Sequence, residues 1–258
     1  MQVENIRLCE PSSVLDDAWR RLYEAAFPEG ERESEANLSK RLAEGKLLVH
    51  RTLNEQGELL GFTMVSLASN FSFLAYMATD ANRRSSGIGT KHLKRLIELL
   101  KEQYPDHLGL FLEIEATDPD TIEISEEEKT TRKRRLAFYT RLGARVVCEQ
   151  AVYLTPSYSQ PGKFWEGELL CIEFGDRVCK HQVVSVIREI YARFYLLPRN
   201  HELVGKVLTE FQQCSGECSN EANSCSHGTV GTRVTSAFRA ARRWISSWLT
   251  KLRRVFSS

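Results

Sequence analysis

The feature that most constrains the fold is a strand-like segment followed by a glycine turn and an amphipathic helix. The run FSFLAYMAT at residues 71–79 is apolar and rich in aromatic residues, which favours a buried strand. Gly87 and Gly89 follow it, and apolar residues at helical spacing then continue until Pro105. Such a turn presents unpaired N–H groups and the positive end of a helix dipole to one small volume. The segment predicts an α/β unit whose turn suits a phosphate, although the same spacing also occurs in turns that only pack tightly.

The rest of the chain alternates between strand and helix patterns. Strands joined by helices, with a hairpin at the start, indicate a mixed α/β sheet of six or seven strands. The expected strands cover residues 46–53, 59–69, 71–79, 108–116, 145–155 and 167–174. The expected helices cover residues 14–27, 37–43, 87–104, 131–143, 183–195 and 201–211, and an acidic polar stretch occupies residues 117–129.

The glycine spacing does not fit a dinucleotide-binding fold. That fold needs a third glycine three residues after the second, and an acidic residue about twenty positions further on. His92 stands where the third glycine would be, and a hairpin precedes the strand. The dinucleotide interpretation is therefore excluded.

Two segments resemble the signatures of the GNAT superfamily of acyl-CoA-dependent N-acyltransferases. RSSGIG at residues 84–89 is similar to the family motif Arg/Gln-x-x-Gly-x-Gly/Ala at a strand-to-helix junction. RRLAFYTRLGARVV at residues 134–147 is similar to its second signature, a helix with Phe-Tyr that leads through a Leu-Gly turn into a strand. One strand separates the two segments, as in the family. The resemblance covers about residues 3–174 and implies the GNAT acyltransferase fold, a mixed sheet flanked by helices, here with a C-terminal helical extension.

The resemblance also implies where acetyl-CoA binds as a co-substrate. The pyrophosphate would lie on the backbone of the glycine turn, and the pantetheine arm would run beside the preceding strand. No metal is expected. The implied cofactor-binding residues are Met77, Ala78, Thr79, Arg84, Ser85, Ser86, Gly87, Ile88, Gly89 and Thr90.

Three side chains are candidates for catalysis of amine attack on a thioester, which needs a base for the amine and an acid for the thiolate. Tyr139 matches the tyrosine that often serves as the acid in the family, or it is a packing aromatic beside Phe138. Glu113 and Glu115 share one face of the strand at 108–116, since strand side chains alternate. Either could be the base, or both could pair with the basic residues 132–135; a water relay is the further alternative.

The function implied by the resemblance is transfer of the acetyl group of acetyl-CoA to a primary amine by direct attack. Two acidic stretches could surround a cationic amine with negative potential, or could be solvated faces. They contain Glu29, Glu31, Glu33, Glu35, Asp118, Asp120, Glu123 and Glu126–Glu128. The alternative function is a GNAT-fold binding module, weakly or not catalytic, that acts through the C-terminal segment.

Four regions are expected along the chain. They are an acetyltransferase domain at 1–178, a helical extension at 179–213, a Cys/Ser-rich linker at 214–231 and a basic amphipathic helix at 232–258. From residue 222 onward there are seven Lys or Arg and no Asp or Glu, whereas residues 1–221 have a net charge of −6 (+1 minus +7). The last segment is typical of a helix that binds an anionic membrane surface or a partner protein, or that packs on its own domain. Nucleic acid is not an expected partner.

Localisation is expected to be cytoplasmic, with peripheral membrane association through the tail. The N-terminal residues lack the basic and apolar regions of a signal peptide, and seven cysteines without framework spacing favour reduced thiols. Cys214, Cys218, Cys225 and His227 have residue types that suit zinc, but their spacing matches no common zinc finger. Acylated cysteines and unstructured thiols are the alternatives.

Overall fold

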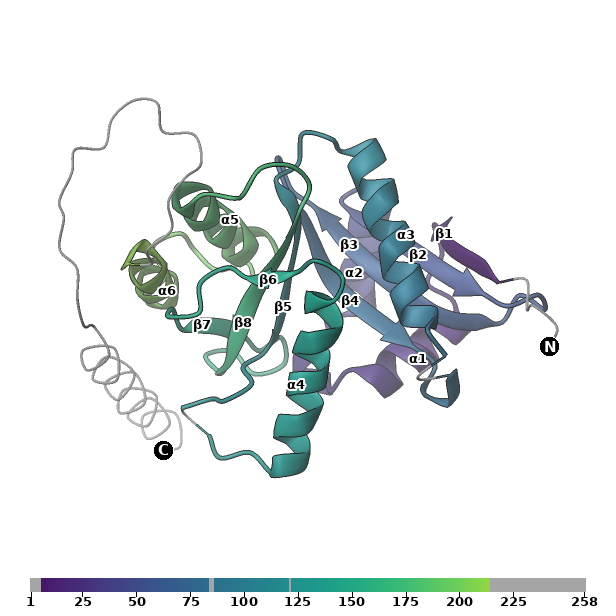
Figure 1. Cartoon of the computed structure of the whole chain (residues 1–258), viewed down its shortest axis with the longest axis horizontal. Coiled ribbons are helices and arrows are strands. Elements are labelled where there is room, and N and C mark those ends of the chain that lie inside the picture. The colour runs from purple at the N-terminus through teal and green to yellow at the C-terminus, as the bar shows by residue number, and fades with distance from the viewer. Residues whose placement is uncertain (1–5, 84–85, 121, 214–258) are drawn as a thin grey trace.

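The computed structural model describes residues 6–83, 86–120 and 122–213 (Figure 1). These residues form one eight-stranded mixed sheet in the order β1-β2-β3-β4-β5-β8-β6, and β7 also pairs with β8. The expected α/β sheet is confirmed, with eight strands instead of six or seven. The strands are β1 (Arg7–Ser12), β2 (Leu47–Leu53), β3 (Leu59–Leu67), β4 (Ser72–Thr79), β5 (Gly109–Glu115), β6 (Arg145–Val146), β7 (Tyr153–Pro156) and β8 (Phe164–Glu173).

The additional strands have simple origins. β1 pairs antiparallel with β2, although its sequence is too polar to show a strand pattern. The single strand expected at 145–155 is two short strands, β6 and β7, each of which pairs with β8. Pairing with a neighbour, and not local periodicity, defines these strands.

Six α-helices and two short 3-10 helices complete the described residues. No helix in this part of the chain is long and apolar enough to cross a membrane. The helices are α1 (Asp17–Ala26), η1 (Glu29–Glu31), α2 (Glu35–Ala43), η2 (Ala81–Arg83), α3 (Ile88–Gln103), α4 (Glu126–Thr140), α5 (Lys180–Arg193) and α6 (Glu202–Gln213).

α4 begins earlier than its sequence pattern predicts. Ser125 caps the helix, because its hydroxyl accepts the N–H of Glu128 at 3.1 Å. Glu126–Glu128 then form the first turn, where carboxylates interact favourably with the positive end of the helix dipole. Part of the acidic stretch at 117–129 is thus the start of the helix that carries Tyr139.

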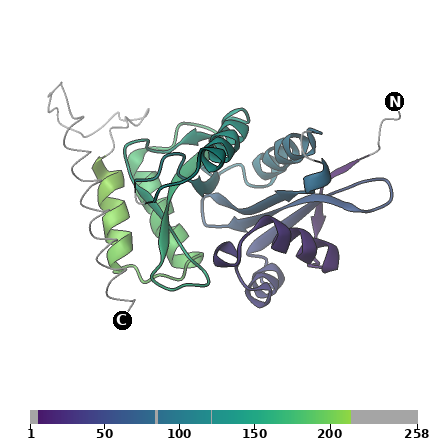
Figure 2. The same cartoon turned by 90° about the horizontal axis from the view of Figure 1, so that it is seen from below.

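Helices cover both faces of the sheet (Figure 2). Alternate residues of β5 divide between the two faces: Leu110 and Leu112 pack with the side chains of α3, whereas Phe111 packs with those of α5 and α6. α1 and α2 cover β2–β4 on the face opposite α3. The helices of the C-terminal extension therefore bury a part of the same sheet that carries the two signature segments.

β4 and β5 separate from one another at their carboxyl ends. They are parallel neighbours, but their register covers only Ser72–Leu74 of β4 and Leu110–Leu112 of β5. The β3–β4 register also shifts between Met64 and Val65, which leaves Ala75 as an extra residue in β4. A bulge bends a strand and increases its twist. The backbone of β4 beyond Leu74 is thus free of β5, and a cavity opens between the two strands.

Candidate active site

The glycine turn joins β4 to α3 as the sequence predicts. Gly87 is the N-cap of α3 and has a φ of 80°, a left-handed conformation that favours glycine. A Cβ atom added there would meet no atom within 4 Å, so the space in front of the turn is open. The first N–H groups of a helix have no partner within the helix. This end of α3 therefore has the geometry of an anion site.

The other predicted turn residues have distinct positions. A Cβ atom on Gly89 would lie 3.4 Å from the Thr79 side chain and 3.6 Å from that of Met77, so Gly89 lies where α3 packs on β4 and an added methyl group would make ordinary contacts there. Ile88 is buried and Thr90 is half-buried in the first turn, whereas Ser86 is exposed and donates its hydroxyl to the Arg83 carbonyl. Arg84 and Ser85 lie outside the described residues.

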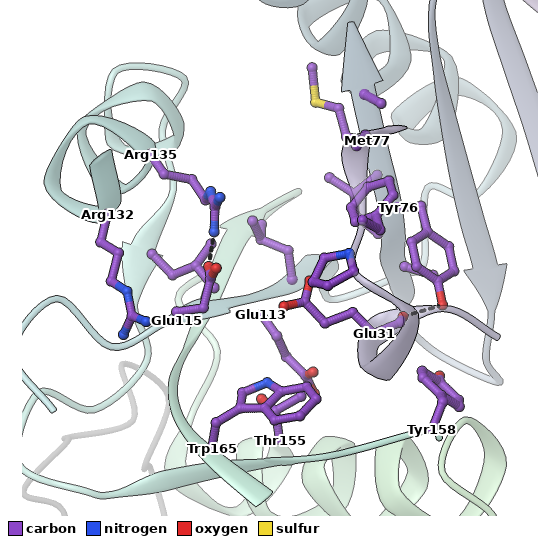
Figure 3. Close-up of a pocket in the computed structure, with 18 of the residues that line it drawn as sticks. Glu31, Tyr76, Met77, Glu113, Glu115, Arg132, Arg135, Thr155, Tyr158 and Trp165 are labelled. Carbon is purple, nitrogen blue, oxygen red and sulfur yellow. Dashed lines mark hydrogen bonds and ion pairs between the residues drawn. The ribbon is translucent and has the colours of Figure 1, made fainter. Parts of the chain in front are cut away.

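A cavity of about 700 Å³ lies where β4 and β5 separate (Figure 3). It brings together side chains of β4, of β5 and of the second signature segment at 134–147, whereas none of the described residues of the first segment, 86–89, lines it. The predicted cofactor-binding and catalytic residues that line it are Met77, Ala78, Thr79, Glu113, Glu115 and Tyr139.

Glu113 is the most unusual side chain of the cavity. Its carboxylate accepts hydrogen bonds from the hydroxyls of Tyr153 and Tyr195, and the side chain of Thr155 also bonds to it. These donors stabilise the ionised form, but burial outweighs them and raises the pKa of Glu113 to about 7. A carboxylate with this pKa can accept a proton near neutral pH, as a general base must.

Glu115 differs from Glu113 although it lines the same cavity. It forms an ion pair with Arg135 of α4. This is the pairing with residues 132–135 that the sequence left open, and it holds for Glu115 but not for Glu113. A carboxylate held by a guanidinium is a weaker base, so Glu113 is the better candidate.

Tyr139 lies on the last turn of α4 and lines the cavity. Its ring packs edge-on against Phe138, with 5.0 Å between ring centroids. Burial raises the pKa of Tyr139 to about 12, so the phenol keeps its proton at neutral pH. The packing role and the acid role are thus compatible in one side chain.

The acidic stretches contribute less to the cavity than their composition suggests. Glu31 and Glu128 line it, while Glu33 is buried in an ion pair with Arg41 at 2.6 Å. The remaining predicted residues do not line the cavity: Glu29, Glu35, Asp118, Asp120, Glu123, Glu126 and Glu127.

Several lining residues escaped the sequence analysis. They come from the β7–β8 region and from the turn after α5, and they are Thr155, Tyr158, Trp165 and Tyr195. Tyr195 was expected inside a helix, but α5 ends at Arg193 and Leu196 has a positive φ of 55°. This turn directs Tyr195 to Glu113. Four tyrosines lie between residues 153 and 195, but nothing in the sequence indicates their partners.

The described residues contain no group of three or more His, Cys, Asp or Glu side chains that could hold a metal ion. The zinc hypothesis for Cys214, Cys218, Cys225 and His227 concerns residues outside the described ranges. The same is true of the amphipathic segment 232–258.

The chain is similar to known acetyltransferases in sequence and in fold. Residues 14–127 match the model of the acetyltransferase (GNAT) family. A GNAT-family protein from Bacteroides thetaiotaomicron superposes with a TM-score of 0.53 and 20% identity, over 69% of this chain and 90% of that chain. No curated protein sequence matches the chain.

Two further solved structures are similar at lower TM-scores. The ribosomal-protein-S18-alanine N-acetyltransferase from Escherichia coli has a TM-score of 0.44 and 17% identity, over 66% of this chain and 97% of that chain. A GNAT family acetyltransferase from Elizabethkingia anophelis, solved with acetyl-CoA bound, has a TM-score of 0.44 and 15% identity, over 66% and 98%. The family match covers the strand–turn–helix unit and the first structure shares the fold, so residues 14–127 are similar in sequence to the acetyltransferase (GNAT) family and the described chain has the fold of a GNAT-family protein.

Proposed function

We propose that the chain is an acetyltransferase that transfers the acetyl group of acetyl-CoA to a primary amine by direct attack, with Glu113 as general base and Tyr139 as general acid. The observation that carries the proposal is the position of Glu113. It is a carboxylate with a pKa of about 7, and it lies in the same cavity as the Tyr139 phenol.

The residues present fit acetyl-CoA. The left-handed turn at Gly87 suits a pyrophosphate, because a Cβ atom added to Gly87 would meet no atom of the described residues within 4 Å. β4 beyond Leu74 has no pairing with β5, so its backbone can bond an extended amide chain such as pantetheine. Met77–Thr79 would hold this arm along one wall of the cavity.

The proposed roles balance the protons of the reaction. The ammonium form of the acceptor loses one proton to Glu113, and the free amine attacks the thioester carbonyl carbon. The C–N bond forms and the C–S bond breaks, while the leaving thiolate takes the phenol proton of Tyr139. The second proton, lost by the new amide nitrogen, restores the phenol through solvent, and Glu113 releases the first proton to solvent before the next turnover.

The experiment is thiol release from acetyl-CoA with a panel of primary amines, for the wild type and three variants. Glu113→Gln keeps an oxygen that can accept the tyrosine hydroxyls but removes the base, so we expect kcat/KM to fall about 100-fold or more. Tyr139→Phe should lower kcat about tenfold or more with little change in the KM for acetyl-CoA. Glu115→Gln is the matched control and should stay within about threefold of the wild type.

The outcomes separate the parts of the proposal. Equal activity of wild type and Glu113→Gln would reject the base, and full activity of Tyr139→Phe would reject the acid. Absence of acetyl-CoA binding by calorimetry would reject the co-substrate, and with it the whole proposed reaction.

A further inference from the structure

The charges that line the cavity do not cancel. Five carboxylates and two guanidinium groups line it, and two ion pairs, Glu115 with Arg135 and Glu128 with Arg132, account for four of these groups. Within the described part of the chain the remaining carboxylates form no ion pair; they are Glu31, Glu113 and Glu166. The cavity thus has a net negative charge that the lining itself does not neutralise.

Glu166 already has a structural role. Glu166 is 8% exposed and accepts the backbone N–H of Asp120 at 2.8 Å, which fixes the segment before α4. Glu31 and Glu113 are the two that remain for a ligand.

Glu31 is held in place from two sides. The Tyr76 hydroxyl donates to the Glu31 carbonyl at 2.9 Å and accepts the N–H of Glu33 at 2.8 Å, which ties η1 to β4. On the other side, the N–H of Tyr158 donates to the carbonyl of Gly30 at 2.8 Å. The backbone of Glu31 is therefore fixed between β4 and the β7–β8 loop, with its side chain at the cavity (Figure 3).

The environment of Glu31 is unfavourable for an anion. Burial raises the pKa of Glu31 more than the nearby Arg135 and Arg132 lower it, and both arginines form ion pairs with other carboxylates. A buried charge without a partner is costly, so a cationic ligand would be bound strongly there. The same reasoning applies to Glu113, which has only hydroxyl partners.

The walls near the two carboxylates suit a hydrocarbon chain with a positive charge. Tyr76, Tyr158 and Trp165 line the cavity, and the hydroxyl of Tyr76 is already bonded to the backbone around η1. Aromatic faces accept both methylene groups and ammonium ions. A cavity with carboxylates on two different segments, η1 and β5, and aromatic walls fits a ligand with two separated cations.

We propose that the acceptor is a linear diamine or polyamine, whose reacting amine lies at Glu113 and whose second ammonium group binds Glu31. The inference rests on the proposed acetyl transfer and adds the substrate class. Glu31 is then a specificity-determining residue that does not take part in proton transfer.

The test compares α,ω-diamines of three to six carbons with the monoamines of the same length. In the wild type we expect kcat/KM for the best diamine to exceed that of its monoamine about tenfold or more, the effect of one charged hydrogen bond. Glu31→Gln should bring this ratio close to one while it leaves the monoamine rate within about twofold. Glu29→Gln is the control, because Glu29 is exposed on the same 3-10 helix and does not line the cavity.

Equal use of diamines and monoamines by the wild type would overturn the inference without any variant. So would a Glu31→Gln enzyme that loses both activities in parallel, since that result indicates a structural role. If acetyl-CoA binds but no member of the series is acetylated, the diamine inference is overturned while the co-substrate assignment stands. A Glu113→Gln enzyme that loses activity toward both the diamine and the monoamine bears only on the proposed reaction, not on the substrate class.

Discussion

At the scale of single residues, the pKa of Glu113 is decided by two opposing effects. Three hydroxyl groups bond to the carboxylate and lower its pKa, while burial raises it from 4.5 to about 7. Burial is the larger effect. Because the hydroxyls act against it, removing any one of them should raise the pKa of Glu113 further.

Tyr195→Phe is predicted to move the acid limb of the kcat/KM profile to higher pH by about one unit, since one unit corresponds to ~1.4 kcal/mol, within the range of one hydrogen bond to a charged group. Glu113 acts as a base only when ionised, so activity is lost below its pKa and the limb follows that pKa upward. The measurement is kcat/KM between pH 5 and 9.

Tyr104→Phe is the matched control, because Tyr104 stacks on His107 outside the cavity. Its profile should superpose on the wild-type profile. An unshifted profile for Tyr195→Phe would mean that Glu113 is not the group that titrates.

At the scale of elements, the strand–turn–helix unit determines where acetyl-CoA can bind. Gly87 combines two properties that a larger residue lacks, a left-handed backbone and the absence of a side chain at the mouth of the turn. An L-residue in that conformation costs about 1 kcal/mol. The effect of a substitution on folding and its effect on the ligand therefore need to be separated.

Gly87→Ala is predicted to raise the KM for acetyl-CoA about tenfold and to lower the free energy of unfolding by about 1 kcal/mol. The added methyl group projects into the space that the pyrophosphate would occupy. Gly45→Ala carries the same backbone strain, with a φ of 67° and no atom within 4 Å of the added Cβ, at a site after α2 away from the cavity. This control should lose similar stability with an unchanged KM, and parallel KM changes in both variants would remove the turn from the binding site.

The strand–turn–helix unit also shows which features of the fold can be predicted from the sequence. The apolar strand, the glycines and the helical face are local patterns, so β4, the turn and α3 were predicted within a few residues. The contact between Glu113 and Tyr195 joins residues 82 positions apart, and that between Glu113 and Tyr153 joins residues 40 apart. No local sequence pattern predicts either contact, because the Tyr195 contact depends on how α5 packs on the sheet and the Tyr153 contact on how β7 pairs with it.

At the scale of the whole molecule, part of the cavity lining comes from residues that follow the segment matched by the family model, residues 14–127. Tyr139, Tyr158 and Trp165 follow that match, and Tyr195 comes from the turn after α5. α5 and α6 also bury the face of β5 that carries Phe111. The core that they complete extends to Phe211 within the described residues.

Removal of residues 232–258 is accordingly predicted to leave kcat and the KM for acetyl-CoA within about twofold of the full chain. Every cavity residue lies between Ala26 and Tyr195, and the removed segment carries seven basic residues and no acidic ones in a chain otherwise net negative (Lys251 and six arginines from residue 232 onward). A basic amphipathic helix binds anionic lipid surfaces through charge and apolar area together. The full chain should therefore sediment with phosphatidylserine-containing vesicles at low salt and the shortened chain should not. Equal sedimentation would remove the membrane hypothesis, whereas a loss of turnover on shortening would place part of the active site in the tail.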